Sequence, residues 1–415
     1  MMRSLFSGVS GLRNHQIRMD VIGNNIANVN TVGYKSSRVT FEEAFAQLLQ
    51  GASRPPGDSS SVSGGVNPVQ VGLGMNIGSI DLLFTQGNIE TTGVTTDLAI
   101  QGDSFFVVSD GSGKNFTRSG NFQLDANGRL VASTNGYIVQ GKLAVDGVLT
   151  DGIRDIKLPF GQKSAARATE NISLAGNLDA EAQVGDTRET TITVYDAMGA
   201  REEVTITFTK ASGTTWDYDI AVADGTVASG DSGTLTFDNE GRLTTPVPNT
   251  PFVFTPLSGA ADVSIDIDWG TAGQVTGLSQ FAAPSTAVLK EQDGYTMGDL
   301  ERFSIDQTGT ITGAFTNGVT LTLAQIALAD FNNPAGLIRT GDNMYTVSAN
   351  SGSPVLGFSG EGSQSAITSG ALEMSNVDLA QEFTSMITAQ RGFQSNARVI
   401  TTSDEMLQEV VTLKR

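Results

Sequence analysis

Apolar residues recur every seven positions at the two ends of this chain, and the stretch between the ends does not repeat the pattern. A heptad repeat of apolar residues is typical of coiled-coil helices, because it places one apolar row along the helix that another helix must cover. We therefore expect terminal helices that pack with each other and with copies of the chain. The N-terminal row is Leu5, Leu12, Met19 and Ile26, with Val9 at the alternate core position, and the C-terminal row is Leu379, Met386, Phe393, Ile400 and Leu407, with Phe383 and Val411 at the alternate position.

The N-terminal helix is predicted over residues 4–28, where Ser4 can cap it and no proline interrupts it. Asn24, Asn25 and Asn28 lie near its end. Asparagine is a weak helix former, but Asn24 and Asn28 lie four residues apart on one face, where paired amides can link packed helices by hydrogen bonds. The alternative is a helix end that frays before a turn. We expect the two apolar rows and these three asparagines to form the assembly interface.

Charge separates the ends of the chain from its middle. Residues 1–50 carry five basic and three acidic groups, and residues 371–415 carry four and six, so the whole formal charge of −19 lies between them. Near-neutral helices can pack without mutual repulsion, whereas an acidic middle stays solvated and disfavours nucleic acid as a partner.

From about residue 75 to residue 357 the apolar period changes to two, which is typical of short antiparallel strands. Segments that begin at Asp125, Asp238 and Asp306 share an Asp-x-x-Gly pattern, which predicts a type I turn closed by a left-handed glycine. The predicted fold class is therefore mixed: N- and C-terminal α-helices form a coiled-coil-like inner domain, and two mostly antiparallel all-β domains are nested outward.

The places where the strand alternation stops predict the domain boundaries, and a stretch rich in Gly, Ser and Pro, including Pro55 and Pro56, predicts an extended connector. The predicted parts are 1–30 with 371–415 as the helical inner domain, 31–74 with 358–370 as the connector, 75–145 with 286–357 as the proximal β-domain, and 146–285 as an inserted outer β-domain.

Ordering the terminal helices costs about 1–2 kcal/mol of backbone entropy per residue, and one helix–helix contact does not offset that cost. We therefore expect residues 1–30 and 371–415 to be largely mobile in the monomer and to become ordered when neighbouring subunits surround them.

No group of residues predicts catalysis. Gly230–Gly233 resembles a serine-nucleophile motif, but the only histidine, His15, lies in the N-terminal helix, and we assign it no role. Asp125 and Asn127 have the spacing of two calcium ligands, yet the glutamate that completes such a loop is missing, so turn chemistry explains them better. The chain has no cysteine. We expect no enzyme activity, no cofactor and no metal site.

Longer motifs at both ends resemble the signature sequences of bacterial flagellar axial proteins, the rod and hook family. Rod proteins of this family are shorter and lack an inserted outer β-domain, so the resemblance favours the hook protein. The matching segments are Ser7–Leu12, Met19–Lys35, Asp97–Gly102 with Phe105–Val108, Asn376–Leu379, Ala389–Ala397 and Thr402–Leu407.

The resemblance implies a structural subunit that self-assembles into the flagellar hook, a flexible tube that carries torque from rod to filament. It also implies these partners: copies of the chain itself, the distal rod protein, the hook cap, the hook–filament junction proteins and the flagellar type III export apparatus. The implied location is the hook at the cell surface, after export without a cleaved signal peptide. The first residues agree, because they contain neither a secretory apolar segment nor a membrane span.

Two rival functions stay open at this point. A flagellar distal rod or hook–filament junction protein would also be a structural subunit. A surface adhesin or glycan-binding module would need exposed aromatic residues, for which Trp216 and Trp269 are the candidates, although their position in alternating strands favours a place in the core.

Overall fold

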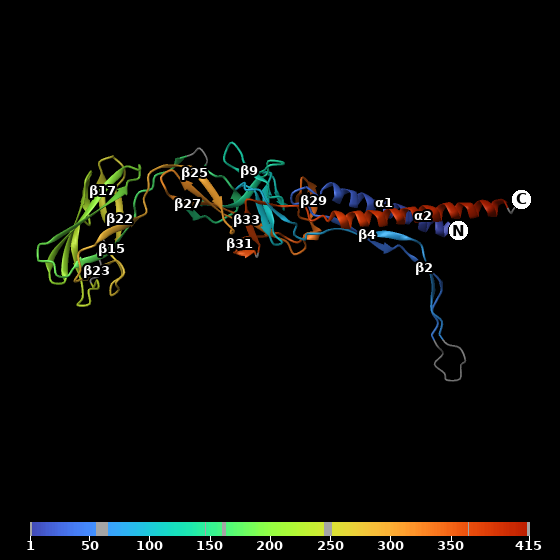
Figure 1. Cartoon of the computed structure of the whole chain (residues 1–415), viewed down its shortest axis with the longest axis horizontal. Coiled ribbons are helices and arrows are strands. Elements are labelled where there is room, and N and C mark those ends of the chain that lie inside the picture. Colours follow the sequence, from blue (N-terminus) through green and yellow to red (C-terminus); the bar gives the residue numbers. More distant parts are fainter. Residues whose placement is uncertain are drawn as a thin grey trace, which may run out of the picture. The chain divides into compact units, whose positions relative to one another are not determined.

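The computed structural model describes residues 2–54, 65–145, 147–159, 163–244, 251–363 and 365–412. In these residues one long helix, α1 (Met2–Ala27), begins the chain and another, α2 (Leu379–Thr412), ends it. The elements between them are β-strands, most of them antiparallel, and one short 3-10 helix, so the predicted mixed fold class is confirmed (Figure 1). Neither of these helices is long and apolar enough to cross a membrane. Pro55, Pro56 and the last residues of the chain lie outside the described residues.

The chain divides into two compact units. Unit 1 comprises Met1–Leu158, Ser304–Thr312 and Thr322–Arg415, and unit 2 comprises Pro159–Phe303 and Gly313–Leu321. The terminal helices thus belong to the same unit as the first group of strands, and residues 286–303 belong to unit 2. The four-part division made from the sequence stays a prediction.

Unit 1 contains the helices and the strands nearest to them in sequence. Its elements are α1, β1 (Ser37–Glu43), β2 (Ala46–Gln50), β3 (Val69–Gly72), β4 (Met75–Leu82), β5 (Ile89–Thr91), β6 (Leu98–Gln101), β7 (Phe105–Ser109), β8 (Lys114–Thr117), β9 (Phe122–Leu124), β10 (Leu130–Ala132), β11 (Ile138–Val145), β12 (Val148–Leu149), β13 (Arg154–Asp155), β28 (Leu328–Asp330), the 3-10 helix η1 (Pro334–Gly336), β29 (Ile338–Gly341), β30 (Met344–Thr346), β31 (Val355–Ser359), β32 (Gly362–Ser363), β33 (Ala366–Ser369), β34 (Ala371–Glu373) and α2.

The core of unit 1 is built around β7, which pairs with β8, β11 and β28. Its apolar run Phe105–Val108 is fully buried, as expected for a strand covered on both faces. Phe105 packs edge-on against Phe84, Phe331 and Tyr345, with ring centroids 5.4–5.8 Å apart. Two short pairs, β33 with β6 and β34 with β5, join the segment that precedes α2 to this core.

Unit 2 contains β14 to β24 and part of three further strands. The elements are β14 (Lys163–Ser164), β15 (Asn171–Asp179), β16 (Thr187–Tyr195), β17 (Arg201–Ser212), β18 (Thr215–Val222), β19 (Gly225–Ser229), β20 (Ser232–Thr236), β21 (Phe252–Pro256), β22 (Val263–Asp268), β23 (Leu278–Phe281) and β24 (Val288–Gln292), and β25 (Gly298–Ile305), β26 (Thr310–Phe315) and β27 (Thr320–Ile326) have residues in both units.

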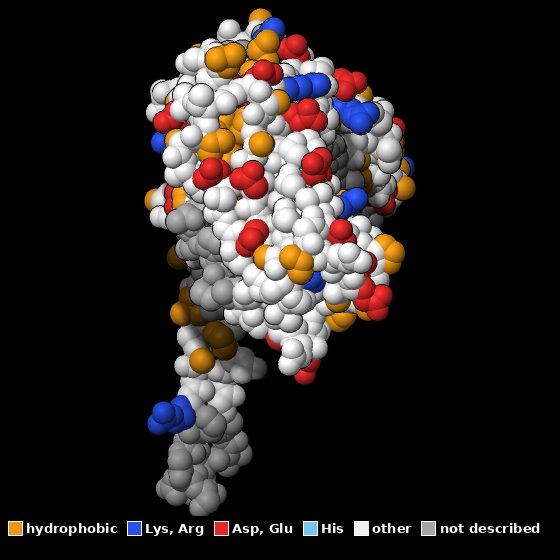
Figure 2. Space-filling view, turned by 90° about the vertical axis from the view of Figure 1, so that its left-hand side faces the viewer, with side chains coloured by type: hydrophobic (Ala, Val, Ile, Leu, Met, Phe, Trp, Pro, Cys, Tyr) orange, Lys and Arg blue, Asp and Glu red, His pale blue; other side chains and the backbone are white. Residues whose placement is uncertain are grey.

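Two sheets of unit 2 share one hydrophobic core. One sheet has the order β16-β17-β18-β20, and the other contains β19-β21-β22-β15-β23 with β24 beside β15. Alternate residues of β17 and β18 point into this core, as their period of two predicts. Trp216 and Trp269 are 1% and 3% exposed, so both belong to the core and neither offers a face for a sugar. On the face of the molecule drawn in Figure 2, acidic side chains are spread out rather than gathered in one place.

The three predicted Asp-x-x-Gly turns are confirmed. In the first, the Gly128 amide donates to the Asp125 carbonyl at 3.0 Å, and the Asp125 carboxylate accepts from the Asn127 and Arg129 amides at 2.8 and 2.7 Å. The turns at Asp238 and Asp306 repeat these bonds. The closing glycine has a φ of 77° in the first turn, which explains the requirement for glycine.

The predicted connector contains regular strands. β1 pairs with β4 beside α1, and β2 pairs with β3 in a two-stranded ribbon that extends away from the helices (Figure 1). The side chains of the ribbon are mostly exposed, among them Leu48, Leu49 and Val69. A two-stranded ribbon without a covered apolar face is at best marginally stable in water.

Candidate assembly site: the paired terminal helices

The two terminal helices lie side by side and run antiparallel (Figure 1). Near the start of α1, Ser4 Oγ lies 3.4 Å from Ser403 Oγ. Near its end, Asn25 Nδ2 donates to Glu382 Oε1 at 3.1 Å. The prediction that the ends of the chain form helices is confirmed, although α1 begins at Met2, so Ser4 lies inside the helix and contacts α2 instead of capping α1.

Glycine residues allow the two helices to approach closely. A Cβ atom added at Gly11 would lie 2.5 Å from Asn396 Nδ2, and one added at Gly392 would lie 2.6 Å from His15 Cε1. Both distances are shorter than any van der Waals contact, so a larger residue at either position would force the Asn396 or His15 side chain out of its place between the helices. We call the contact row Ser4, Gly8, Gly11, His15 and Asn25 of α1, with Glu382, Ala389, Gly392, Asn396 and Ser403 of α2, the helix seam.

The helix seam is not formed by the predicted apolar rows. Within this chain Ile400 contributes to it, with Cγ1 at 3.1 Å from a Cβ placed on Gly8, whereas Val9 and Phe383 are 53% and 51% exposed. The remaining apolar residues flank the seam and are only partly covered. Half-buried are Leu5, Leu12, Met19, Ile26, Met386, Phe393 and Leu407, and exposed are Leu379 and Val411.

The asparagines of α1 have separate roles. Asn28, which directly follows α1, donates from Nδ2 to Asn24 Oδ1 at 2.7 Å, so these two amides bond to each other at the end of α1 rather than to α2. Asn25 makes that link. It is 1% exposed, and beyond its bond to Glu382 it donates to the Ser37 carbonyl at 2.8 Å and accepts from the Ser37 amide at 3.0 Å. Asn25 therefore fixes the end of α1 to both α2 and β1.

A buried ion triad lies where the helices meet the strands of unit 1. Lys35 Nζ lies 2.6 Å from Glu373 Oε1, and Arg118 Nη1 lies 3.4 Å from Glu373 Oε2. All three side chains are shielded from solvent. Lys35 follows α1, Arg118 follows β8, and Glu373 ends β34, so the triad ties the bases of both helices to the β-core.

The triad is also held by backbone groups. Lys35 Nζ donates to the Thr85 carbonyl at 2.8 Å, Arg118 Nη2 donates to the Gly102 carbonyl at 2.7 Å, and the Gly87 amide donates to Glu373 Oε1 at 2.9 Å. Burial lowers the pKa of Lys35 and of Arg118, and the Glu373 carboxylate opposes both shifts. With two cations around one anion, Glu373 is the charge on which the burial of the other two depends.

Gly33 explains the glycine of the N-terminal motif. It has a φ of 67°, and a Cβ on it would lie 2.6 Å from the Ser119 amide nitrogen. Its own amide donates to the Glu373 carbonyl at 2.7 Å. A residue with a side chain would force the segment after α1 away from the ion triad.

His15, which the sequence left without a role, lies in the helix seam against Gly392. Its ring packs edge-on against Phe41 of β1 at 5.7 Å, and its buried Nδ1 has no hydrogen-bond partner among the described residues. Desolvation, and next the nearby Arg18 guanidinium, lower the pKa of His15 below 6.5. The imidazole is therefore neutral at pH 7 in the paired helices.

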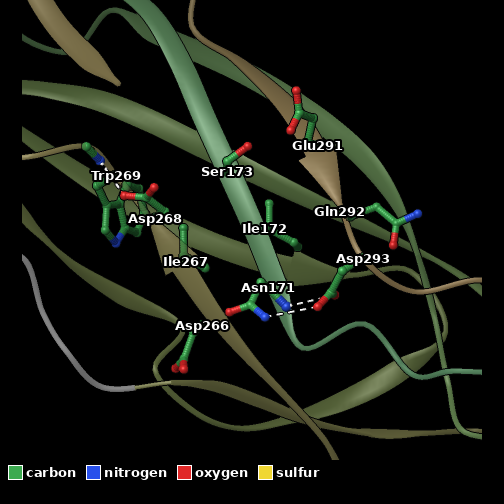
Figure 3. A pocket seen from close by; sticks show the side chains of 11 residues that line it. Asn171, Ile172, Ser173, Asp266, Ile267, Asp268, Trp269, Glu291, Gln292 and Asp293 are labelled. Atoms are coloured by element: carbon green, nitrogen blue, oxygen red, sulfur yellow. Dashed lines mark hydrogen bonds between the residues drawn. The ribbon is translucent and has the colours of Figure 1, made fainter. Parts of the chain in front are cut away.

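The pocket drawn in Figure 3 belongs to unit 2 and has a volume of about 560 Å³. Asp266, Asp268, Glu291 and Asp293 contribute to its lining, but no group of three or more acidic or histidine side chains in the described residues is arranged to hold a metal ion. The Asp293 carboxylate already has a hydrogen-bond partner within the protein, because its Oδ2 accepts from Asn171 Nδ2 at 2.9 Å.

Family models match most of the chain. The models are a flagellar basal body rod protein over residues 5–35, the D1 domain of flagellar hook protein FlgE/F/G over 99–177, the D2 domain of flagellar basal body protein FlaE over 164–295, and the C-terminal part of flagellar basal body rod FlgEFG protein over 368–413.

Similarity to a relative over the full length of both chains shows the family. The flagellar hook protein FlgE of Treponema pallidum is 42% identical to this chain over 100% of both chains. The chain belongs to the flagellar hook protein family. A flagellar basal-body rod protein FlgG of Bacillus subtilis is 32% identical, also over 100% of both chains. A crystal structure of Helicobacter pylori FlgE2 superimposes with a TM-score of 0.53 at 15% identity, covering 69% of this chain and 100% of that chain, which supports the fold alone.

Sequence reasoning missed structural residues that belong to neither apolar row. Gly8, Gly11 and Gly392 carry the helix seam, and Lys35 and Glu373 carry the ion triad. The glycines were visible as an i, i+3 pair in the first helix, where glycine is unfavourable and therefore needs a packing reason.

Replacing Glu373 tests the ion triad. Glu373→Gln keeps the shape of the side chain but leaves Lys35 and Arg118 buried without a counter-charge, so we expect a loss of roughly 3–5 kcal/mol in the free energy of unfolding of unit 1. Urea unfolding followed by circular dichroism measures it. The matched control Glu361→Gln removes an exposed carboxylate of the same unit and should change stability by less than about 0.5 kcal/mol. Equal effects of the two variants would contradict the triad.

Titration of His15 tests the helix seam. Since the chain has one histidine, its ring protons can be followed by NMR without assignment of other histidines. The folded pKa lies below the unfolded value of 6.5, so the unfolded state binds more protons, and the paired helices lose stability as pH falls from about 6.5 through the folded pKa. His15→Gln should remove this part of the pH dependence. A histidine pKa at or above 6.5 in the folded monomer would show that the ring is not desolvated in the seam.

Proposed function

We propose that the apolar rows on α1 and α2 are covered by neighbouring copies of the chain, which thereby build a tube with helices on its inner wall and acidic β-units outside. As a member of the flagellar hook protein family, the chain is a structural subunit of the hook, the flexible joint that carries torque from rod to filament. One observation carries the proposal: the helices pair through small and polar residues, while Val9, Phe383 and Val411 stay exposed.

The physical reason is the weakness of a seam of this kind. Small side chains bury little apolar area, and burial of apolar area is the main favourable term in helix packing. The half-buried and exposed apolar residues gain that term only when a second surface covers them. Near-neutral charge at both ends of the chain permits such contacts between copies, whereas the acidic middle keeps the β-units solvated.

We propose that the tube bends through movements between the β-units of neighbouring subunits. Our hypothesis is that polar loops of axially stacked subunits, in residues 75–145 and 286–357, slide over one another and exchange contacts at little cost, while the helices stay rigid in torsion. The exposed ribbon β2–β3 supports a further contact between copies, because its apolar side chains Leu48, Leu49 and Val69 lack a covering surface among the described residues.

The further partners follow from family membership and are proposals for this chain. They are the distal rod protein at one end of the tube, the hook cap and the hook–filament junction proteins at the other, and the flagellar type III apparatus for export to the cell surface. Asn24 and Asn28 stay proposed as contacts to other copies.

A distal rod or hook–filament junction protein is the second candidate, and the full-length similarity to a rod protein favours it over unrelated classes. Curvature of the assembled tube separates hook from rod. The glycan-binding alternative is not supported, because both tryptophans are buried in the core of unit 2. Known members of the hook protein family are structural proteins, and the described residues contain no metal-binding cluster.

The assembly proposal predicts that an exposed charge on an apolar row blocks polymerisation without harming the monomer. In Phe383→Asp the side chain lies on the surface of the monomer, so its melting temperature should stay within a few degrees of wild type, whereas the critical concentration for tube growth should rise at least tenfold, because burial of a phenylalanine contributes roughly 1.5–3 kcal/mol. Sedimentation of the polymer measures this concentration.

A valine in unit 1 serves as the matched control. Val148→Asp places the same charge at a side chain that is 71% exposed and distant in sequence from the helices. It should leave both the melting temperature and the critical concentration unchanged. If Phe383→Asp polymerises as the control does, the apolar rows are not the assembly surface.

A further inference from the structure

The end of α2 extends past the start of α1. Ser403 lies opposite Ser4, so the residues after Ser403 have little or no α1 beside them (Figure 1). Nine residues from Asp404 to Thr412 add about 13 Å of helix at 1.5 Å per residue. We call this segment the α2 overhang.

One face of the α2 overhang combines apolar and acidic side chains. Met406, Glu409 and Val410 lie at spacings of three and four and therefore share a face. Met406 and Val410 are each 50% exposed, and Glu409 is exposed as well. The overhang thus presents a half-exposed apolar strip with a negative charge in it.

A groove between α1 and β4 has the complementary composition. It has a volume of about 420 Å³, and Phe6, Val9, Ile17 and Ile77 supply apolar walls. Phe6 and Val9 are more than half exposed. Arg13 lies in the same lining and has no ion-pair partner among the described residues.

Hydrogen bonds keep this groove in shape. Asn14 Nδ2 donates to the Met75 carbonyl at 2.6 Å, and Ser10 Oγ accepts from the Met75 amide at 3.3 Å. α1 is therefore fastened to β4 along the groove, which exists before any ligand enters it. A pre-formed apolar groove with one unpaired cation suits an amphipathic helix that carries one carboxylate.

The overhang cannot reach the groove of its own chain. Gly11 lies opposite Asn396, so in antiparallel helices Arg13 lies beside residue 394 of α2. Glu409 is fifteen residues further along α2, which corresponds to about 22 Å of helix. Another copy must therefore supply the occupant.

We propose that the α2 overhang of one copy docks in the α1–β4 groove of a second copy, with Glu409 paired to Arg13 and with Met406 and Val410 against Phe6 and Val9. The proposal rests on the self-assembly proposed above and adds a specific contact to it. It makes the end of α2 the segment that connects successive subunits, since one overhang and one groove are present on every copy.

A charge-swap cycle tests the contact. Arg13→Glu and Glu409→Arg each place like charges in the contact, so each should raise the critical concentration for tube growth at least fivefold, while the melting temperature of the monomer stays unchanged because both side chains are exposed. The double variant Arg13→Glu with Glu409→Arg should return to within twofold of wild type. Sedimentation of full-length protein gives all four values.

A second double variant controls for net charge. Arg13→Glu with Glu361→Arg restores the same net charge with an exposed residue outside the overhang, and it should not rescue growth. Equal rescue by both doubles, or no rescue by the first, would overturn the docking of the overhang. Normal growth of both single variants would overturn it too, and if Phe383→Asp still blocks growth, assembly through the apolar rows stands without this contact.

Discussion

The close approach of α1 and α2 along the helix seam is the contact on which the rest of the molecule depends. Glycines on each helix leave room for a side chain of the opposite helix, so that a single added Cβ at Gly11 or Gly392 would overlap Asn396 or His15. A seam of small residues fixes the register of two helices by shape. It contributes little apolar burial, and for that reason it leaves the larger apolar side chains on the outer faces of the pair.

The ion triad and Asn25 give this helical pair a fixed base. Lys35, Arg118 and Glu373 come from three segments far apart in sequence, and each is buried where α1, α2 and the core of unit 1 meet. Displacing any one of these buried charges is costly, because it leaves another charge unpaired in a medium of low polarity. The helices are thereby joined to the β-strands by directional bonds as well as by packing.

Local patterns were sufficient to predict the long helices, the presence of strands in the middle of the chain and three turns, but not the strands β1, β2 and β3 of the predicted connector. The heptads of Leu5 and Leu379 predicted helices, the period of two between about residues 75 and 357 predicted strands, and the Asp-x-x-Gly pattern predicted turns at the correct residues, because each signal arises from residues close together in sequence. The residues through which the two helices pair could not be predicted in the same way. Gly8 and Gly392 have no apolar signal, and the contact between Lys35 and Glu373 joins residues 338 positions apart. The apolar rows themselves were assigned to the assembly interface, and that assignment remains a proposal.

Amide hydrogen exchange along α1 and α2 tests the central claim most directly, namely that the helices are stabilised mainly by apolar contacts between copies. Exchange is measured on the dilute monomer and on the assembled tube, with the β-core around Phe105–Val108 as an internal reference. We predict that both helices exchange faster than the β-core in the monomer, because the helix seam alone stabilises them weakly, and that both are strongly protected in the tube. Helices whose amides in the dilute monomer are protected as strongly as those of the β-core would contradict the claim.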